Sequence, residues 1–316
     1  MSTYTNDKLQ IIADTITTAM DKKGVEWFKP FTNKSAFTRY NMPSNVVSGA
    51  NYSGFNSFWL QMVNSAAGYD SVQWATFKQI QSLGGRVLKG EKATPVCYYG
   101  THTKKVEIDG QEVTDAYRFL KFYNVFNLSQ TNLNSLVQDE QLLKDNVEPT
   151  KPLIERINSV DNFVSNLNAD IRHEQAGKCC YYPTKDYINM SPLDSWSAGD
   201  NYESKEEAYY AVLLHELAHW TGHEKRLNRE KGNPFGSEGY AFEELIAEYS
   251  SAFLCGILNI SKVPSDNHAA YISNWSRAIK KDPKKLLKAI AAAQKVVNFM
   301  QDKQAIKQPN KVQEAA

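Results

Sequence analysis

Two stretches in the first half of the chain predict helices. In residues 7–20 apolar side chains recur every three or four positions, which is the repeat of an amphipathic helix. The residues that carry this repeat are Leu9, Ile12, Ile16 and Ala19. Residues 71–83 show a similar rhythm and end at Gly84-Gly85, a pair that favours a turn. We therefore expect a helix in each stretch.

The segments that follow are rich in β-branched and aromatic residues, which is typical of strands. The predicted strands are residues 87–88, 95–99, 104–108 and 116–126. Asp109-Gly110 lies between the last two, and this dipeptide suits the positive φ angles of a tight hairpin. The first half of the chain is therefore predicted to mix helices and strands.

Helical patterns dominate the second half. Residues 206–222 are rich in Ala, Leu and Glu, contain no proline and end at Gly222, a common helix terminator. Residues 242–258 predict a second helix and residues 284–300 a third, which follows Asp282-Pro283, a favourable helix start. The predicted fold class is α+β, with a mixed α/β N-terminal domain and a mainly helical C-terminal domain that contains a small antiparallel sheet.

A polar connector separates the two halves. Residues 128–151 are rich in Gln, Asn, Ser and Asp and are followed by Pro152. The predicted division is therefore residues 1–127 for the first domain, 128–151 for a linker and 152–303 for the second domain. Residues 304–316 are polar and of low complexity, and we expect them to form a disordered tail.

Composition limits the kinds of protein that the chain encodes. Hydrophobic residues make up 42% and charged residues 22%, as in ordinary globular proteins, and the net charge of +1 argues against a chain that coats nucleic acid by charge alone. Residues 1–127 still hold 14 Lys and Arg against 10 Asp and Glu. No secretion signal or membrane-spanning stretch is evident, and the four cysteines lack the spacing of a metal site. We expect a cytoplasmic protein with reduced thiols and no membrane partner.

The most informative motif is His215-Glu216-Leu217-Ala218-His219. Residues four positions apart share one face of a helix, so the two imidazoles can bind one metal ion. A catalytic zinc site keeps three protein ligands and an open position for water, and a nearby carboxylate can take the proton of that water. The motif therefore predicts His215 and His219 as ligands of Zn²⁺, with Mn²⁺ as the alternative ion, and Glu216 as the catalytic base.

The site needs a third ligand, and two histidine arrangements fit poorly. His223 lies two helical turns beyond His215, about 12 Å along the axis at about 1.5 Å per residue, which is too far for easy sharing of one ion. A third histidine six residues after His219 is excluded, because that position is Lys225. The third ligand is therefore expected elsewhere in the chain, with His223 as a weaker alternative.

Residues 242–248 resemble the second half of a glutamate-zincin site, in which a helix of the form Glu-x-x-Ala-acid supplies the missing ligand. The resemblance implies Glu244 as the ligand and Glu248 as the acid that orients a histidine, since ligating histidines usually donate their other ring proton to a carboxylate. Glu243 is the alternative ligand. The remaining alternative is that these acids only solvate a helix surface.

Aromatic side chains of the first half alternate with cationic and amide side chains. Proteins hold single-stranded nucleic acid with rings that stack on bases and cations that follow phosphates. Most of these rings, Trp59 and Trp74 in particular, fit a hydrophobic core better than a binding surface. The predicted DNA-binding candidates are Lys29, Arg39, Tyr52, Phe55, Asn56, Lys78, Arg86, Lys89 and Lys92.

Several short motifs together resemble the ArdC-type antirestriction proteins. Those of the first half resemble that family's N-terminal single-stranded-DNA-binding domain, which is also similar to a domain of primases carried by conjugative plasmids. They are residues 27–30, 43–45, 51–56, 74–79, 84–87, 89–92 and 125–127. Those of the second half resemble the family's zincin-like domain, and they are residues 187–190, 215–223, 226–229 and 240–245. The resemblance covers nearly the whole chain.

The resemblance implies a protein of a plasmid or phage that binds incoming single-stranded DNA and shields it from host restriction. It leaves the chemistry of the metal site open. In one interpretation the site is a metallopeptidase that cleaves a host restriction or defence protein, and the N-terminal domain serves only for delivery or protein interaction. Residues 186–190 would then be an edge strand for the peptide and Tyr240 an oxyanion donor. The alternative, which the sequence favours, is that Tyr240 is a packing residue. In the other interpretation the ion only stabilises the fold.

Overall fold

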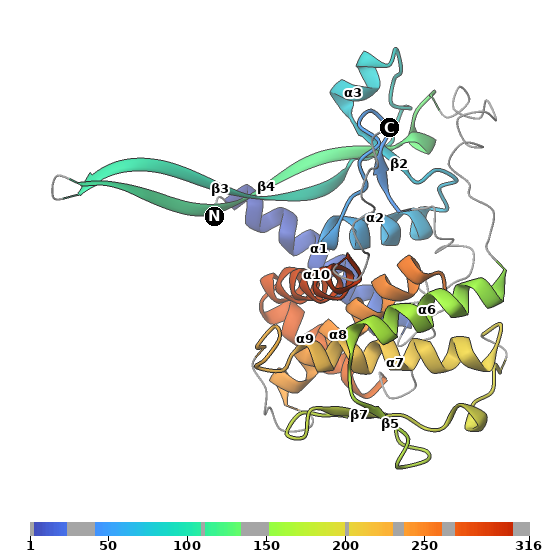
Figure 1. Ribbon diagram of the computed structural model, residues 1–316. Coiled ribbons are helices and arrows are strands. Elements are labelled where there is room, and N and C mark those ends of the chain that lie inside the picture. The colour runs from blue at the N-terminus through green and yellow to red at the C-terminus, as the bar shows by residue number, and fades with distance from the viewer. Residues whose placement is uncertain are drawn as a thin grey trace, which may run out of the picture. The chain divides into compact units, whose positions relative to one another are not determined.

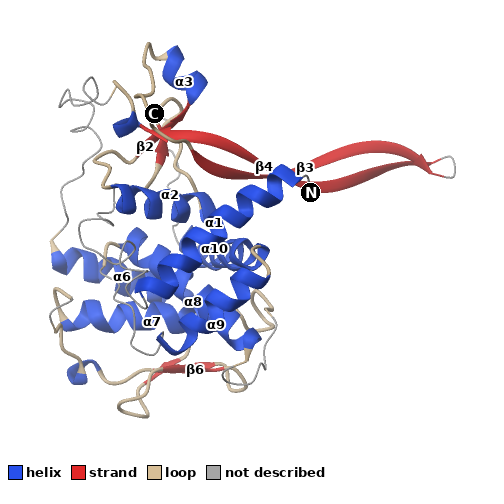
Figure 2. Cartoon of the chain, turned by 180° about the vertical axis from the view of Figure 1, so that it is seen from behind, coloured by secondary structure: helices blue, strands red, loops and turns tan. Residues whose placement is uncertain are grey.

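The computed structural model describes residues 3–23, 42–108, 111–133, 152–199, 202–229, 237–260 and 269–305. The chain divides into two compact units. Unit 1 comprises Met1–Thr18 with Asn41–Val147, and unit 2 comprises Ala19–Tyr40 with Glu148–Ala316. Unit 1 combines helices with a sheet, whereas unit 2 is mainly helical (Figures 1 and 2). The predicted α+β fold class is confirmed.

Unit 1 is built on a four-stranded sheet in the order β1-β2-β4-β3. β1 (Ser44–Asn45) runs parallel to β2 (Gln73–Thr76), whereas β4 (Gln111–Asn127) runs antiparallel to both β2 and β3 (Thr94–Ile108). β2 pairs only with Val125, Phe126 and Asn127 of β4, so β3 and the rest of β4 form a two-stranded ribbon (Figure 1).

The predicted hairpin is confirmed, because β3 and β4 stay paired up to Ile108 and Gln111. Asp109-Gly110, which separates them, lies outside the described residues. The strands predicted at 95–99 and 104–108 are parts of the single strand β3. Residues 87–88 form no strand, and only a bridge between Val87 and Thr131 is present there.

The helix predicted at residues 71–83 is only partly correct. Its first half is β2, and α3 begins at Phe77 and ends at Ser82. Trp74 and Ala75 of β2 are fully buried. Pairing with β4 therefore outweighs the local helical rhythm, since strand formation depends on long-range contacts.

The other helices of unit 1 are α2 (Gly54–Ala67), the first part of α1 (Thr3–Lys23) and the short 3-10 helix η2 (Leu128–Gln130). α1 contains the helix predicted at residues 7–20. Leu128 and Leu133 are buried and pack with Ala75 and Ile80. The domain border at residue 127 stays a prediction, and this packing favours a border after Leu133.

Unit 2 contains the helices α6 (Leu153–Leu167), α7 (Lys205–Thr221), α8 (Glu238–Leu258), α9 (Ala269–Lys281) and α10 (Lys284–Ala305), together with the 3-10 helix η3 (Leu193–Ser195). These confirm the three helices predicted in the second half. Asp282 starts α10 as predicted, since its Oδ1 accepts the Lys284 N–H at 3.1 Å.

A three-stranded sheet lies against α7 on the side opposite to α8 and α10 (Figure 1). Its strands are β5 (Ile171–Arg172), β7 (Tyr187–Asn189) and β6 (Cys180–Tyr182), in that spatial order. The predicted antiparallel sheet is in fact mixed, because β5 and β7 run parallel. The edge strand predicted at residues 186–190 is also wrong, because β7 occupies the centre of the sheet and β6 forms an edge.

Candidate metal centre

Two histidines on α7 face each other across one helical turn. The Nε2 atoms of His215 and His219 lie 3.1 Å apart, and their ring planes are inclined by 76°. α7 is continuous through the motif because Ser204 caps its start, where the Ser204 hydroxyl accepts the Glu207 N–H at 3.2 Å. Helix geometry alone therefore brings the two imidazoles together.

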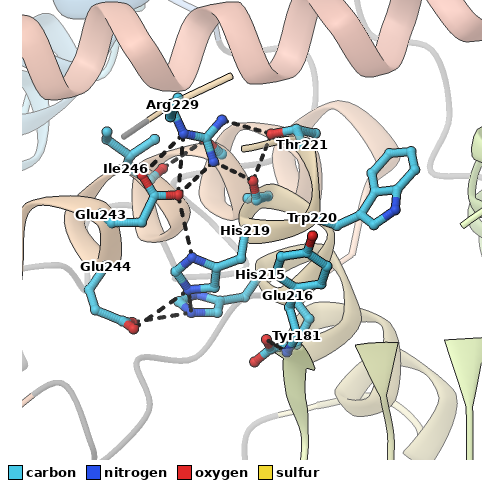
Figure 3. A network of polar contacts seen from close by, with 12 residues as sticks. Tyr181, His215, Glu216, His219, Trp220, Thr221, Arg229, Glu243, Glu244 and Ile246 are labelled. Carbon is cyan, nitrogen blue, oxygen red and sulfur yellow. Dashed lines mark hydrogen bonds and ion pairs between the residues drawn. The ribbon is translucent and has the colours of Figure 1, made fainter. Parts of the chain in front are cut away.

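Glu244 reaches the same point from α8 (Figure 3). Its carboxylate oxygens lie 3.4 Å from Nε2 of His215 and 3.6 Å from Nε2 of His219. The three donor atoms lie within 4.8 Å of one another, and together they could hold a metal ion. The structure thus brings together the three residues that the sequence pointed to as ligands.

A further carboxylate lies behind each histidine. Glu248 Oε1 is 2.6 Å from Nδ1 of His215, and Glu243 Oε1 is 3.5 Å from Nδ1 of His219. Because an imidazole that donates from Nδ1 exposes a lone pair at Nε2, these contacts point both Nε2 lone pairs toward Glu244. A cluster of two lone pairs and a carboxylate is favourable only around a cation, so the donor set fits a metal ion.

The pKa values of His215, His219 and Glu244 also indicate that the site stabilises a positive charge. Burial lowers the pKa of His215, but the carboxylates of Glu244 and Glu248 outweigh it and leave the pKa raised. The pKa of His219 is raised well above its ordinary value in the same way, by Glu243 and Glu244 against the effect of burial. Burial raises the pKa of Glu244, yet the two imidazoles hold that pKa far below its usual range.

Arg229 fixes Glu243 in place, as Figure 3 shows. Its Nη2 donates to Glu243 Oε1 at 2.6 Å, and its Nε lies 3.1 Å from the other oxygen. The same guanidinium binds the end of α7 through Thr221 Oγ1 at 2.8 Å and the Ala218 carbonyl at 2.7 Å. A Cβ atom at Gly222 would lie 2.9 Å from Arg229 Nη2, so glycine leaves room for this contact.

Glu216 points from α7 toward the small sheet. It is only 8% exposed, and its Oε2 accepts the backbone N–H of Tyr181 at 2.8 Å. Tyr181 lies on the edge strand β6, where it is opposite Ile188 of β7. One oxygen of the carboxylate is therefore held by the sheet.

A second polar cluster holds the turn between β6 and β7. Asp186 sits in this turn at a φ of +57°, accepts a hydrogen bond from the Tyr181 hydroxyl at 2.9 Å and pairs with Arg226. Arg226 also stacks over the ring of Trp220, 3.9 Å from its centroid. His223 contacts Asp186 at 3.8 Å, so the structure directs it to this cluster. The cluster holds Tyr181, and with it Glu216.

Tyr240 lies in the first turn of α8, one turn before Glu244. Its backbone N–H donates to the hydroxyl of Ser237, which caps the helix, at 3.2 Å. The side chain is partly buried. Its role as an oxyanion donor stays a prediction.

The DNA-binding candidates differ in how far their side chains are exposed. Phe55 is only 6% exposed, and both polar atoms of the Asn56 amide bond the backbone of Cys97, at 2.7 and 2.8 Å. Tyr52 is partly buried, and burial raises its pKa. The exposed candidates are Lys78, Arg86, Lys89 and Lys92. Lys29 and Arg39 lie outside the described residues.

Tyr181 and Arg229 are parts of the site that were not predicted from the sequence. Arg229 belongs to the segment 226–229, which lies just after the histidine helix, and a cation beside an acid-rich site was the available signal. No local pattern marks Tyr181, because it contributes through its backbone. Among the described residues no helix is both long and apolar enough to cross a bilayer.

Two family models match the chain, one in each half. The model described as the N-terminal domain of anti-restriction factor ArdC matches residues 6–126. The model described as a zincin-like metallopeptidase matches residues 158–294.

Solved structures of one protein are similar to the whole chain. They are the metal-free and Mn(II)-bound crystal structures of the antirestriction protein ArdC from plasmid R388. The identities are 33% and 32% and the TM-score is 0.71 for both, over 95% of this chain and 99% of the other.

Curated relatives include one protein of similar length and two much longer ones. The uncharacterized protein y4eC of Sinorhizobium fredii is 34% identical over 87% of this chain and 85% of its own length. Two DNA primases TraC of Escherichia coli are 35% and 30% identical over 82% and 92% of this chain. The chain spans only 24% and 20% of the length of these primases.

Proposed function

Because the chain belongs to the ArdC family of antirestriction proteins, we propose that it protects the incoming DNA of a mobile element from host restriction. Unit 1 binds single-stranded DNA, and unit 2 is a metal-dependent peptidase. The family models of both halves support this proposal, as does the similarity to DNA primases and to an antirestriction protein of a plasmid. The proposed peptide substrate is a host restriction or defence protein.

The observation that carries the enzymatic half is the meeting of His215, His219 and Glu244 within 4.8 Å. Two imidazoles and one carboxylate suit Zn²⁺ with an open fourth position, and this is the proposed ion. Mn²⁺ is the alternative, since the related R388 protein has an Mn(II)-bound structure. When bound, the ion would polarise a substrate carbonyl and make a water molecule easier to deprotonate.

Glu216 is the proposed general base of the reaction. The Tyr181 N–H holds its Oε2, so Oε1 is left to accept a proton from the attacking water and to pass it to the leaving amine. Because an edge strand can pair with an extended peptide, β6 takes the substrate-binding role that the sequence assigned to residues 186–190. Glu248 and Glu243 orient the two histidines.

The proposal is tested by replacing Glu216 with Gln, which keeps the shape of the side chain and removes its basicity. The expected result is loss of protection when marked plasmid DNA is transferred into a restricting host, with unchanged metal content and single-stranded-DNA affinity. The matched control is Glu224→Gln, an exposed acid in the turn after α7.

Full protection by the Glu216→Gln variant would contradict the peptidase and favour an ion that only stabilises the fold. Loss of metal in the variant would show instead that Glu216 takes part in binding the ion. Loss of single-stranded-DNA affinity would show that the two proposed activities are coupled.

A further inference from the structure

Unit 1 exposes aromatic rings that lie on the β3–β4 ribbon. Tyr98 is 53% and Tyr123 50% exposed. By contrast, Phe55, Trp59 and Trp74, which lie in the aromatic-rich stretch of the sequence, are buried. A ring that stacks on a base must present a free face, so the ribbon is a better platform than α2 or β2.

The strand register places these rings on one face with a cation between them. Tyr98 is opposite Lys121, Gly100 is opposite Phe119, and Tyr123 lies two residues beyond Lys121 on the same strand. The ring of Tyr98 is 6.3 Å from that of Tyr123 and 6.1 Å from that of Phe119, between centroids. The ammonium group of Lys121 lies 5.0 Å from the centroid of Phe119.

Gly100 lets the Phe119 ring lie flat across the neighbouring strand. A Cβ atom at Gly100 would be only 2.3 Å from Cζ of this ring. Phe119 is thereby half-buried and supports one side of Tyr98. Phe119 thus supports the cluster, while the rings of Tyr98 and Tyr123 remain exposed to solvent.

The edge of β3 is less available than this face. The N–H of Cys97 donates to Asn56 Oδ1 at 2.8 Å, and its C=O accepts from Asn56 Nδ2 at 2.7 Å. These bonds occupy the edge next to Tyr98, where an extended peptide would otherwise pair. The arrangement therefore favours a ligand that uses ring faces over one that adds a strand.

Cationic side chains of unit 1 are available for phosphates. Lys121 is exposed, as are Lys78, Arg86, Lys89 and Lys92. Within the described part of the chain, no carboxylate forms an ion pair with any of these five side chains. Exposed rings interleaved with an exposed cation are the combination that binds single-stranded nucleic acid without strong sequence preference.

We propose that Tyr98, Phe119 and Tyr123, with Lys121 between them, form the surface on which bases of single-stranded DNA stack. The proposal rests on the DNA-binding half of the proposed function and assigns it to the β3–β4 ribbon. The rings contact the bases, and Lys121 contacts the phosphate backbone.

The test replaces Tyr98 and Tyr123 together with Val in the full-length chain. Valine keeps the strand preference of the ribbon but has no flat ring, so the change separates stacking from ribbon stability. Since the change removes two rings that stack on bases, the dissociation constant for a labelled oligothymidine should rise by at least about 10-fold in fluorescence anisotropy. Double replacement with Phe should leave affinity unchanged.

Phe77→Val is the matched control, because this ring is 50% exposed on α3 and lies outside the ribbon. It should bind DNA like the wild-type chain. Lys121→Gln should lower the slope of log affinity against log salt concentration by about 0.7, which is the value for one phosphate contact on a single strand. Circular dichroism melting of each variant verifies that the fold is retained, and the Lys121→Gln slope decides the matter if the Val variant melts early.

The possible outcomes distinguish a failure of the proposed DNA-binding function from a failure of the proposed surface. A wild-type chain that binds no single-stranded DNA overturns the DNA-binding half of the proposed function and this surface with it. A wild-type chain that binds, together with a Val variant of equal affinity, overturns only the surface. Normal DNA affinity of the Val variant with lost protection in cells would show that the ribbon contacts a protein instead.

Discussion

The metal centre of unit 2 and the aromatic face of unit 1 are built in opposite ways. At the metal centre each histidine has its own carboxylate behind it, and Glu248 is only 2% exposed. On the ribbon, Tyr98 and Tyr123 are about half exposed, and the ring of Tyr98 lies near the rings of Tyr123 and Phe119. Chemistry at an ion requires groups fixed in advance, whereas stacking requires open surface.

The largest effect is expected when one of the metal ligands is removed. His215→Ala removes one of three donors that meet within 4.8 Å. Affinity for Zn²⁺ should fall by more than about 100-fold, beyond the usual effect of losing a group behind a ligand. Isothermal titration calorimetry measures the affinity.

His223→Ala is the matched control for this change, because His223 follows His219 by another four residues but lies beyond the end of α7 and contacts Asp186. It should keep the affinity of the wild-type chain. If both variants bind metal equally well, the ion lies elsewhere. If His215→Ala also loses affinity for single-stranded DNA, the metal centre and the DNA-binding surface do not act independently.

The next effect concerns a hydrophobic core cluster of unit 1. Leu128 is fully buried against Ala75, Ile80 and Leu133. Leu128→Ala should lower the free energy of unfolding of unit 1 by about 2–5 kcal/mol, since it leaves a cavity in a close-packed core. Urea titration followed by tryptophan fluorescence measures it, and Trp59 and Trp74 are the two of the six tryptophans that lie in unit 1.

Leu88→Ala, at a leucine that is 42% exposed, should change the free energy of unfolding by no more than about 0.5 kcal/mol. Metal content should stay normal in both variants. If Leu128→Ala leaves the free energy of unfolding unchanged, Leu128 belongs to the linker, as predicted from the sequence.

A smaller effect is expected behind His215. Glu248 Oε1 lies 2.6 Å from His215 Nδ1, and it is a group that orients the histidine without binding the ion in our proposal. Glu248→Gln should weaken Zn²⁺ binding by about 10- to 100-fold. An effect as large as that of His215→Ala would identify Glu248 as a ligand.

The smallest effect is expected behind His219. The contact of Glu243 with His219 is longer, 3.5 Å, and Glu243 is shared with Arg229. Glu243→Gln should weaken Zn²⁺ binding by less than about 10-fold, at the low end of such effects. Arg229→Gln combined with it should add little, because Arg229 acts through Glu243. Additive losses would mean that Arg229 supports the end of α7 independently.

Agreement between sequence and structure is best where one helix determines the outcome. The four-residue spacing of His215 and His219 fixes their common face, and α7 forms as predicted. Glu244 could be assigned only through resemblance, because its position depends on how α8 packs on α7. The partners of Glu216 and Glu243 are Tyr181 and Arg229, and only the structure shows which residue binds which carboxylate.

The strand regions were harder to predict. The helical rhythm of residues 71–83 conceals β2, which exists because it pairs with β4. Phe55 and Asn56 were both predicted to contact DNA, yet one is buried and the other bonds to Cys97. Which side of a strand faces water follows from register and packing, and neither is written in the local sequence.

The sequence by itself determined the α+β class, the helix that carries the metal-binding histidines, and the resemblance that led to the family. Only the tertiary structure decided that Glu248 and Glu243 lie behind different histidines, that β6 and not residues 186–190 is an edge strand, and that Tyr98 and Tyr123 are exposed. The physical reason is the separation along the chain of the residues that determine each feature. A helix repeats over a few residues, whereas these contacts join residues that are distant in the chain and meet only when helices and strands pack.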